Sequence, residues 1–154
     1  MTTCRDIMTA DPLCHESSVS VGLVAKTMKE NDIGPVPIVD SQNHLIGIVT
    51  DRDLTVRVLA TDRDGRATKV KDVMTSNPVA CCEDDNIEYA LKIMEQCQVR
   101  RIPVVDIENR LQGIISQADI ATRLKIPSQT AEVVEEVSRT VVEHDEVHGR
   151  YKEI

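Results

Sequence analysis

The octapeptide GIVTDRDL, residues 47–54, returns 66 positions later as GIISQADI, residues 113–120. Sliding the chain against itself by this distance gives an ungapped match that extends far beyond the octapeptides. The matching pieces are DIMT (6–9) with DVMT (72–75), Pro12 with Pro78, VPIVD (36–40) with IPVVD (102–106), and Arg57 with Arg123. A repeat of this length indicates two copies of one supersecondary unit, which helical periodicity alone would not produce.

Each copy carries the same pattern of predicted elements. Apolar residues at i, i+3, i+4 and i+7 predict an amphipathic helix in both copies, formed by Val21, Val24, Ala25 and Met28 and by Ile87, Ala90, Leu91 and Met94. Two short apolar strands around a polar turn predict a hairpin next, at 36–39 and 45–49 and again at 102–105 and 111–115. A second helix is predicted over 51–60 and 117–125, and a short first strand at 12–14 and 78–80.

The predicted fold is therefore a mixed α/β (α+β) fold of two β-α-β-β-α repeats. The first repeat spans 4–60 and the second 70–126, with a polar linker at 61–69. Halves of about 60 residues are marginally stable alone, so we expect them to pack against each other. Residues 127–154 are predicted to form a C-terminal amphipathic helix and a polar tail.

The composition excludes several classes of function. A net charge of −8 argues against nucleic-acid binding, which requires a basic face. The chain has no Phe or Trp, so its core must be aliphatic and it offers no aromatic platform for bases. No apolar run approaches the roughly 20 residues of a membrane span, and no signal segment opens the chain. We therefore expect a cytoplasmic protein that binds neither membrane nor nucleic acid.

The five cysteines are odd in number and lack CxxC spacing, so neither a zinc knuckle nor a disulfide framework is indicated. The simpler interpretation is that they are reduced thiols, some of them buried as small apolar residues. The alternative is redox sensing or metal capture, if Cys81 and Cys82 meet Cys14 in space.

The repeated octapeptide places a hydroxyl and a carboxylate three residues apart, where a strand gives way to a helix. Thr50 with Asp53, and Ser116 with Asp119, should each converge on one spot. A carboxylate can accept two hydrogen bonds at once, which suits the adjacent 2′- and 3′-hydroxyls of a ribose. The alternative is that each Asp only caps its own helix, since Asp is favoured in a first turn.

Three phrases each appear twice and in the same order, and together they cover residues 4 to about 125: D-I-M-T-x-x-P, hydrophobic-Pro-hydrophobic-Val-Asp, and G-h-h-[ST]-x-x-D, where h is a hydrophobic residue. With them the chain resembles the cystathionine-β-synthase (CBS) domain, arranged as the tandem pair called a Bateman module. The resemblance implies pseudo-two-fold symmetry between the repeats, a homodimer, and regulation of a partner protein. It also implies a regulatory adenosyl ligand (AMP, ADP, ATP or S-adenosylmethionine) in clefts between the repeats, with no catalytic cofactor.

The resemblance also implies how the site residues are shared. Each ribose-binding Asp works with the short first strand of the other repeat, which meets the base, and with residues before that repeat's strand proline, which meet the phosphate. For the first cleft the matching residues are Ile48, Thr50, Arg52, Asp53, Val79, Ala80, Arg100 and Arg101. For a second, weaker cleft they are Leu13, Cys14, Ile114, Ser116 and Asp119.

The two clefts should differ in what they bind, because Gly34, Pro35 and Ala118 stand in the second where the first has arginines. Arginine suits a phosphate, so the first cleft should take a nucleotide. The second should hold an uncharged adenosine moiety or remain empty.

No catalytic motif is found in the sequence, and we expect a protein that is not an enzyme. His144 and His148 are spaced i, i+4, which is a weak metal signal, and an exposed polar tail is the simpler interpretation. The alternative function is an interaction, redox- or metal-responsive protein whose clefts bind no nucleotide.

Overall fold

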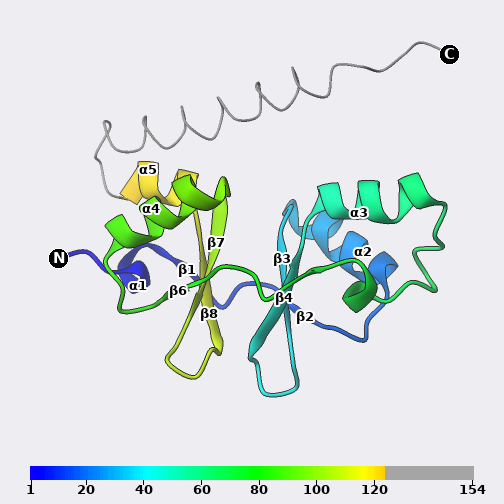
Figure 1. Cartoon of the computed structure of the whole chain (residues 1–154), viewed down its shortest axis with the longest axis horizontal. Coiled ribbons are helices and arrows are strands. Elements are labelled where there is room, and N and C mark those ends of the chain that lie inside the picture. Colours follow the sequence, from blue (N-terminus) through cyan, green and yellow to red (C-terminus); the bar gives the residue numbers. More distant parts are fainter. Residues whose placement is uncertain (124–154) are drawn as a thin grey trace, which may run out of the picture.

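The computed structural model describes residues 1–123. It forms two halves that lie side by side, each a four-stranded sheet with helices (Figure 1). The helices are α1 (Cys4–Ile7), α2 (Val21–Asn31), α3 (Asp51–Arg57), α4 (Ile87–Cys97) and α5 (Gln117–Arg123), with short 3-10 turns η1 (Leu59–Thr61) and η2 (Val70–Asp72). The strands are β1 (Thr9–Ala10), β2 (His15–Glu16), β3 (Val36–Val39), β4 (Leu45–Val49), β5 (Thr75–Ser76), β6 (Cys81–Cys82), β7 (Arg101–Val105) and β8 (Leu111–Ser116). The predicted C-terminal helix, with His144 and His148, lies outside the described residues.

Each repeat gives its opening segment to the other half. The sheet of the first half has the order β2-β3-β4-β5, and that of the second half β1-β8-β7-β6. Strand β1 comes from the start of the chain but pairs with β8, and β5 opens the second repeat but pairs with β4. We call residues 4–10 and 70–76 the crossing segments. Their exchange makes the halves interdependent, as the small size of each half predicts.

Apolar side chains of the crossing segments complete the core of the half that they join. Ile7 packs in the cluster formed around α4, β7 and β8, and Val70 and Val73 pack in the cluster around α2, β3 and β4. Met8 and Met74 lie against Gly113 and Gly47, where a Cβ atom would overlap the methionine side chain. The methionine of the first repeated phrase and the glycine of the third are therefore contact partners across the repeats.

The halves meet where their hairpins turn. Asn43 and Asn109 have left-handed backbones, with φ of 68° and 64°. The Asn43 side chain donates to the carbonyl of Leu111, and the Asn109 side chain donates to that of Leu45, at 3.0 Å in both cases. A small apolar cluster of Val39, Leu45, Val105 and Leu111 lies beside these bonds. The reciprocal contacts give the junction its pseudo-two-fold symmetry.

We expect Asn43→Ala to lower the free energy of unfolding by about 1.5 kcal/mol, because Ala loses the bond to Leu111 and is strained at positive φ. Asn43→Gly should cost about half as much, since glycine adopts the same φ freely. Urea unfolding of both variants measures the difference. Equal losses would mean that backbone strain has no part in the effect.

The hairpin strands of the first repeat have the predicted bounds, and those of the second extend one residue further. The predicted strands at 12–14 and 78–80 are wrong. These residues bridge the two sheets, from β1 to β2 and from β5 to β6, and therefore belong to neither ladder. The short first strands form only after this bridge, where β2 and β6 pair in parallel with β3 and β7.

The aspartate that ends each VPIVD-type phrase closes a hairpin turn. Asp40 accepts hydrogen bonds from the backbone N–H groups of Gln42 and His44. Asp106 accepts the matching bonds from Glu108 and Arg110. A hydrogen bond from the His44 ring lowers the pKa of Asp40.

Among the helices of residues 1–123, none has the length and apolar character that crossing a membrane requires.

Candidate functional site

Thr50 and Asp53 converge as their spacing predicts. Thr50 follows β4 and caps α3, and Asp53 is the third residue of that helix. The backbone N–H and the hydroxyl of Thr50 both donate to Asp53 Oδ2, at 2.8 and 3.0 Å, and the N–H of Asp53 donates back to Thr50 Oγ1 at 3.2 Å. This is a capping box. The capping role is therefore present, and it leaves Asp53 Oδ1 outside the box.

Ser116 and Asp119 repeat the arrangement at the start of α5. The N–H and hydroxyl of Ser116 donate to Asp119 Oδ2, and the N–H of Asp119 donates back to Ser116 Oγ at 3.1 Å. Both carboxylates are largely buried, with 17% of the Asp53 side chain and 21% of the Asp119 side chain exposed. The two halves thus hold matching carboxylates in one fixed orientation.

An arginine one turn after each carboxylate was not among the predicted site residues. Arg57 lies 3.6 Å from Asp53 Oδ1 and donates to the carbonyl of Val73 at 2.6 Å. Arg123 lies 3.9 Å from Asp119 Oδ1 and donates to the carbonyls of Ile7 and Met8. The sequence signal was available, because Arg57 matches Arg123 in the repeat.

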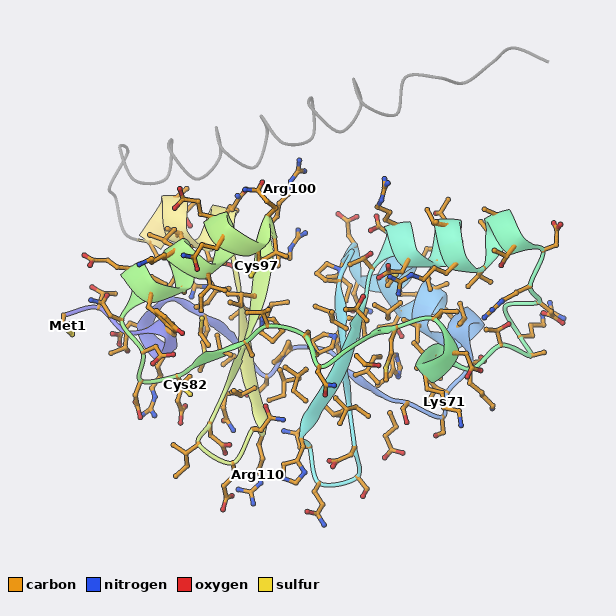
Figure 2. The ribbon with its side chains drawn as sticks, viewed as in Figure 1. Met1, Lys71, Cys82, Cys97, Arg100 and Arg110 are labelled. Atoms are coloured by element: carbon orange, nitrogen blue, oxygen red, sulfur yellow. The ribbon has the colours of Figure 1, made fainter. Side chains whose placement is uncertain are left out.

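Arg100 and Arg101 lie where β7 begins, at the end of the strand away from the junction. Figure 2 shows Arg100 and Arg110 at opposite ends of the second half. Arg101 pairs across the ladder with Ser116, and the Arg100 carbonyl accepts the N–H of Gln117 at 3.1 Å. Their backbone therefore adjoins the Ser116 cap, while Thr50 follows the corresponding end of β4 in the first half.

The side chains of Arg52, Arg100 and Arg101 are available for a ligand. All three residues are exposed, and none of their guanidinium groups forms an ion pair or a hydrogen bond with another residue of 1–123. At the matching place in the first half, a Cβ on Gly34 would lie 3.4 Å from Asp51 Oδ1. The arginines that distinguish the first predicted cleft from the second are therefore also the ones whose guanidinium groups have no partner within the described chain.

The predicted base-contacting residues lie on the bridges between the sheets. Leu13 and Val79 are about half exposed, whereas Cys14 and Ala80 pack against the apolar cluster at the junction. These residues are placed beside both halves, although they form no strand. Burial raises the pKa of the Cys14 thiol.

Ile48 and Ile114 occupy matching positions on β4 and β8. Ile48 pairs with Thr75 of one crossing segment and Ile114 with Thr9 of the other. Both isoleucines are half-buried, on the sheet face opposite the buried positions of their strands. They therefore border the crossing segments rather than the helix-covered core.

Gln117 is a second group that sequence reasoning missed. Its side-chain Nε2 is buried and has no hydrogen-bond partner among residues 1–123. A buried amide donor without an acceptor is costly, which makes it a candidate contact for a bound polar group. It directly follows Ser116 of the second site.

Among residues 1–123, Cys81 and Cys82 do not join Cys14 in a metal-binding group, although Cys81 contacts Cys4. Cys81 is buried in the core with Cys4, Cys82 is exposed, and Cys14 lies at the junction. The hydrogen bond to Cys4, together with burial, raises the pKa of Cys81, and burial and nearby Asp85 raise that of Cys82. Within residues 1–123 no group of three His, Cys, Asp or Glu is arranged to hold a metal ion.

Solved structures of several proteins share this fold. The crystal structure of Hypoxic Response Protein I with two coordinated zinc ions has a TM-score of 0.74 and 36% identity, covering 79% of this chain and 98% of that one. The CBS domain pair of protein MJ0100, in complex with methylthioadenosine and S-adenosyl-L-methionine, has a TM-score of 0.72 and 28% identity, covering 81% and 97%. CBSX2 in complex with AMP has a TM-score of 0.70 and 27% identity, covering 82% and 99%.

The sequence comparisons agree with the structural ones. Hypoxic response protein 1 of Mycobacterium tuberculosis is 37% identical over 124 residues, which are 80% of this chain and 86% of that protein. The family model described as the CBS domain matches twice, over residues 4–60 and 70–126. The chain therefore belongs to the CBS domain family, with its two domains arranged as a tandem pair.

Proposed function

We propose that the protein is a regulatory module that binds an adenine nucleotide at Asp53 and is not itself an enzyme. The observation that carries this proposal is the fixed carboxylate of Asp53, with Oδ2 held in the capping box and Oδ1 outside it. Oδ1 keeps both of its lone pairs outside the box, and a charged oxygen of this kind can accept hydrogen bonds from the two adjacent ribose hydroxyls. The proposal is supported by the adenosyl ligands of two structural relatives, AMP in CBSX2 and S-adenosyl-L-methionine in the MJ0100 pair.

The phosphate would be bound by Arg100 and Arg101 of the second half, together with Arg52 beside Asp53. These guanidinium groups have no partner among residues 1–123, and a phosphate would supply one. The base would lie against Val79 and Ala80 on the bridge between β5 and β6, and against Ile48. Aliphatic contacts of this kind are what a chain without Phe or Trp can offer.

The second site would use Ser116, Asp119, Leu13, Cys14 and Ile114. We propose that it takes an uncharged adenosyl group or stays empty, because the matching positions carry Gly34, Pro35 and Ala118 instead of arginines. The unpartnered Gln117 amide would donate to a hydrogen-bond acceptor of such a ligand.

Ligand binding would favour one arrangement of the two halves, as a shift between existing populations. We further propose that this change is transmitted through a homodimer to a regulated partner protein. Apolar side chains on the helical surfaces support such a contact, since Leu23, Val56, Leu59 and Tyr89 are about half exposed or more. Light scattering on a size-exclusion column measures the mass and tests the dimer.

A thermal-shift screen of the purified chain with AMP, ADP, ATP, NAD and S-adenosylmethionine tests the proposal. A ligand at 100 times its Kd stabilises the native state by about 2.7 kcal/mol, which for a chain of this length raises Tm by about 5–10 °C. We expect AMP, ADP or ATP to produce this rise. The absence of a shift with every adenosyl compound would overturn the proposal.

The alternative is a metal- or thiol-responsive protein, which the two zinc ions of Hypoxic Response Protein I favour. The same screen distinguishes it when Zn²⁺ and an oxidant are included. A Tm rise with Zn²⁺ or a change with oxidant, and none with nucleotide, would select the alternative.

A further inference from the structure

Arg57 joins two parts of the molecule that the proposed site uses separately. One guanidinium nitrogen lies 3.6 Å from Asp53 Oδ1, and another donates to the Val73 carbonyl at 2.6 Å. Val73 belongs to the crossing segment 70–76, which is covalently continuous with Val79 and Ala80. The proposed ribose contact and the proposed base contact are thus linked through one side chain.

The two bonds of Arg57 differ in strength. Its contact with Asp53 is long and partly screened, because 45% of the Arg57 side chain is exposed. The bond to the Val73 carbonyl is short and charge-assisted. Arg57 should therefore hold the crossing segment firmly, while its weaker contact with the carboxylate can respond to a ligand.

We propose that Arg57 is a positioning residue that orients the Asp53 carboxylate and transmits ligand occupancy to the crossing segment 70–76. This inference rests on the proposed function. Ribose hydroxyls that donate to Asp53 Oδ1 share this oxygen with Arg57, which stays beside it, and the guanidinium group bonds more closely to its other acceptor, the Val73 carbonyl. The segment becomes more firmly held, and with it the bridge that carries Val79 and Ala80.

The second half has a matching arginine, which bonds to residues much further away in the sequence. Arg123 contacts Asp119 and donates to the Ile7 and Met8 carbonyls of the other crossing segment, 4–10. Arg57 and Val73 are 16 residues apart, whereas Arg123 and Ile7 are 116 apart. Each carboxylate is therefore connected to its own crossing segment, and the two connections can be perturbed independently.

Hydrogen exchange of the full chain, with and without saturating AMP, tests the inference in wild type, Arg57→Gln, Arg57→Lys, Arg123→Gln and Lys92→Gln. Without AMP, Arg57→Gln should speed exchange in 70–76 about three- to tenfold and leave 4–10 unchanged, and Arg123→Gln should do the reverse. Lys92→Gln removes the same charge from an exposed position on α4 and should change neither.

With AMP, wild type should gain protection in 70–76. Arg57→Gln should bind AMP about tenfold more weakly by calorimetry and gain no protection there, even at saturation. Arg57→Lys, which keeps the charge and one donor, should recover part of both effects, and it replaces the Gln variant if that variant does not fold.

The possible failures are distinguishable. If wild type binds no adenosyl ligand, the proposed function fails and this inference fails with it. If wild type binds AMP but Arg57→Gln, or Arg57→Lys in its place, shows the wild-type affinity and the wild-type protection of 70–76, the inference is wrong and the proposed function stands.

Discussion

Asp53→Asn in the full chain should lower the affinity for AMP about 100-fold or more. Two ribose hydroxyls would lose a charged acceptor, and each hydrogen bond to a charged group contributes about 1.5–3 kcal/mol. Asn is preferred to Ala here because Asp53 also accepts the bonds of the capping box. An Asn side chain still offers one acceptor oxygen to Thr50, so α3 keeps most of its cap. Calorimetric titration of wild type and variant measures the loss.

Asp119→Asn is the matched control, because Asp119 has the same capping contacts and belongs to the second site, whose proposed residues include no arginine. We expect it to change AMP affinity by less than about threefold. Equal losses from both variants would contradict the assignment of the nucleotide to the Asp53 side. Far-UV circular dichroism of each variant confirms that the helices remain.

Gly113→Ala should lower the free energy of unfolding by about 2–3 kcal/mol, the upper part of the range for overpacking. A Cβ at residue 113 would lie 2.8 Å from Met8 Cγ and 2.9 Å from Met8 Cβ. Met8 Cβ is fixed by the backbone of the crossing segment, so the overlap cannot be removed by a side-chain rotation. The segment itself must shift, and urea unfolding measures the cost.

Gly47→Ala provides the comparison in the first half. A Cβ there would overlap Met74 Sδ and lie 3.1 Å from Met74 Cγ and Cε. A flexible methionine can move most of these atoms by changing rotamer, so the cost should stay below about 1 kcal/mol. Adding Met8→Ala to Gly113→Ala should recover part of the lost stability. If the double variant is as unstable as the two single losses added together, the overlap is not the cause.

The parts of the fold that were predicted correctly are those with a local signal. Strands β3 and β4 follow from short apolar runs around the turn that Asp40 begins, and this pattern needs no knowledge of the other half. Strands β1 and β5 were missed because each has two exposed residues and no alternation. Their exchange between the sheets depends on contacts between segments far apart in sequence, and a self-comparison of the repeats cannot reveal it.

The residues of the candidate site that were predicted correctly are likewise those with a local signal in the sequence. Convergence of Thr50 with Asp53 follows from three-residue spacing at a strand-to-helix junction, and the structure confirms it. Arg57 was passed over because its second partner is a backbone carbonyl, that of Val73, which carries no signature in the sequence. The match with Arg123 shows that the arginine is repeated, but it does not indicate which groups Arg57 contacts.

The exchange of crossing segments has a consequence for a chain cut in the linker 61–69. The N-terminal piece would keep an edge strand that fits only the sheet of the other piece, and the reverse would hold for the C-terminal piece. Neither piece can complete its own sheet, but two identical pieces can complete each other's sheets by exchanging their edge strands. A lone repeat is in this sense half of a symmetric pair, and the tandem chain encodes such a pair in a single polypeptide.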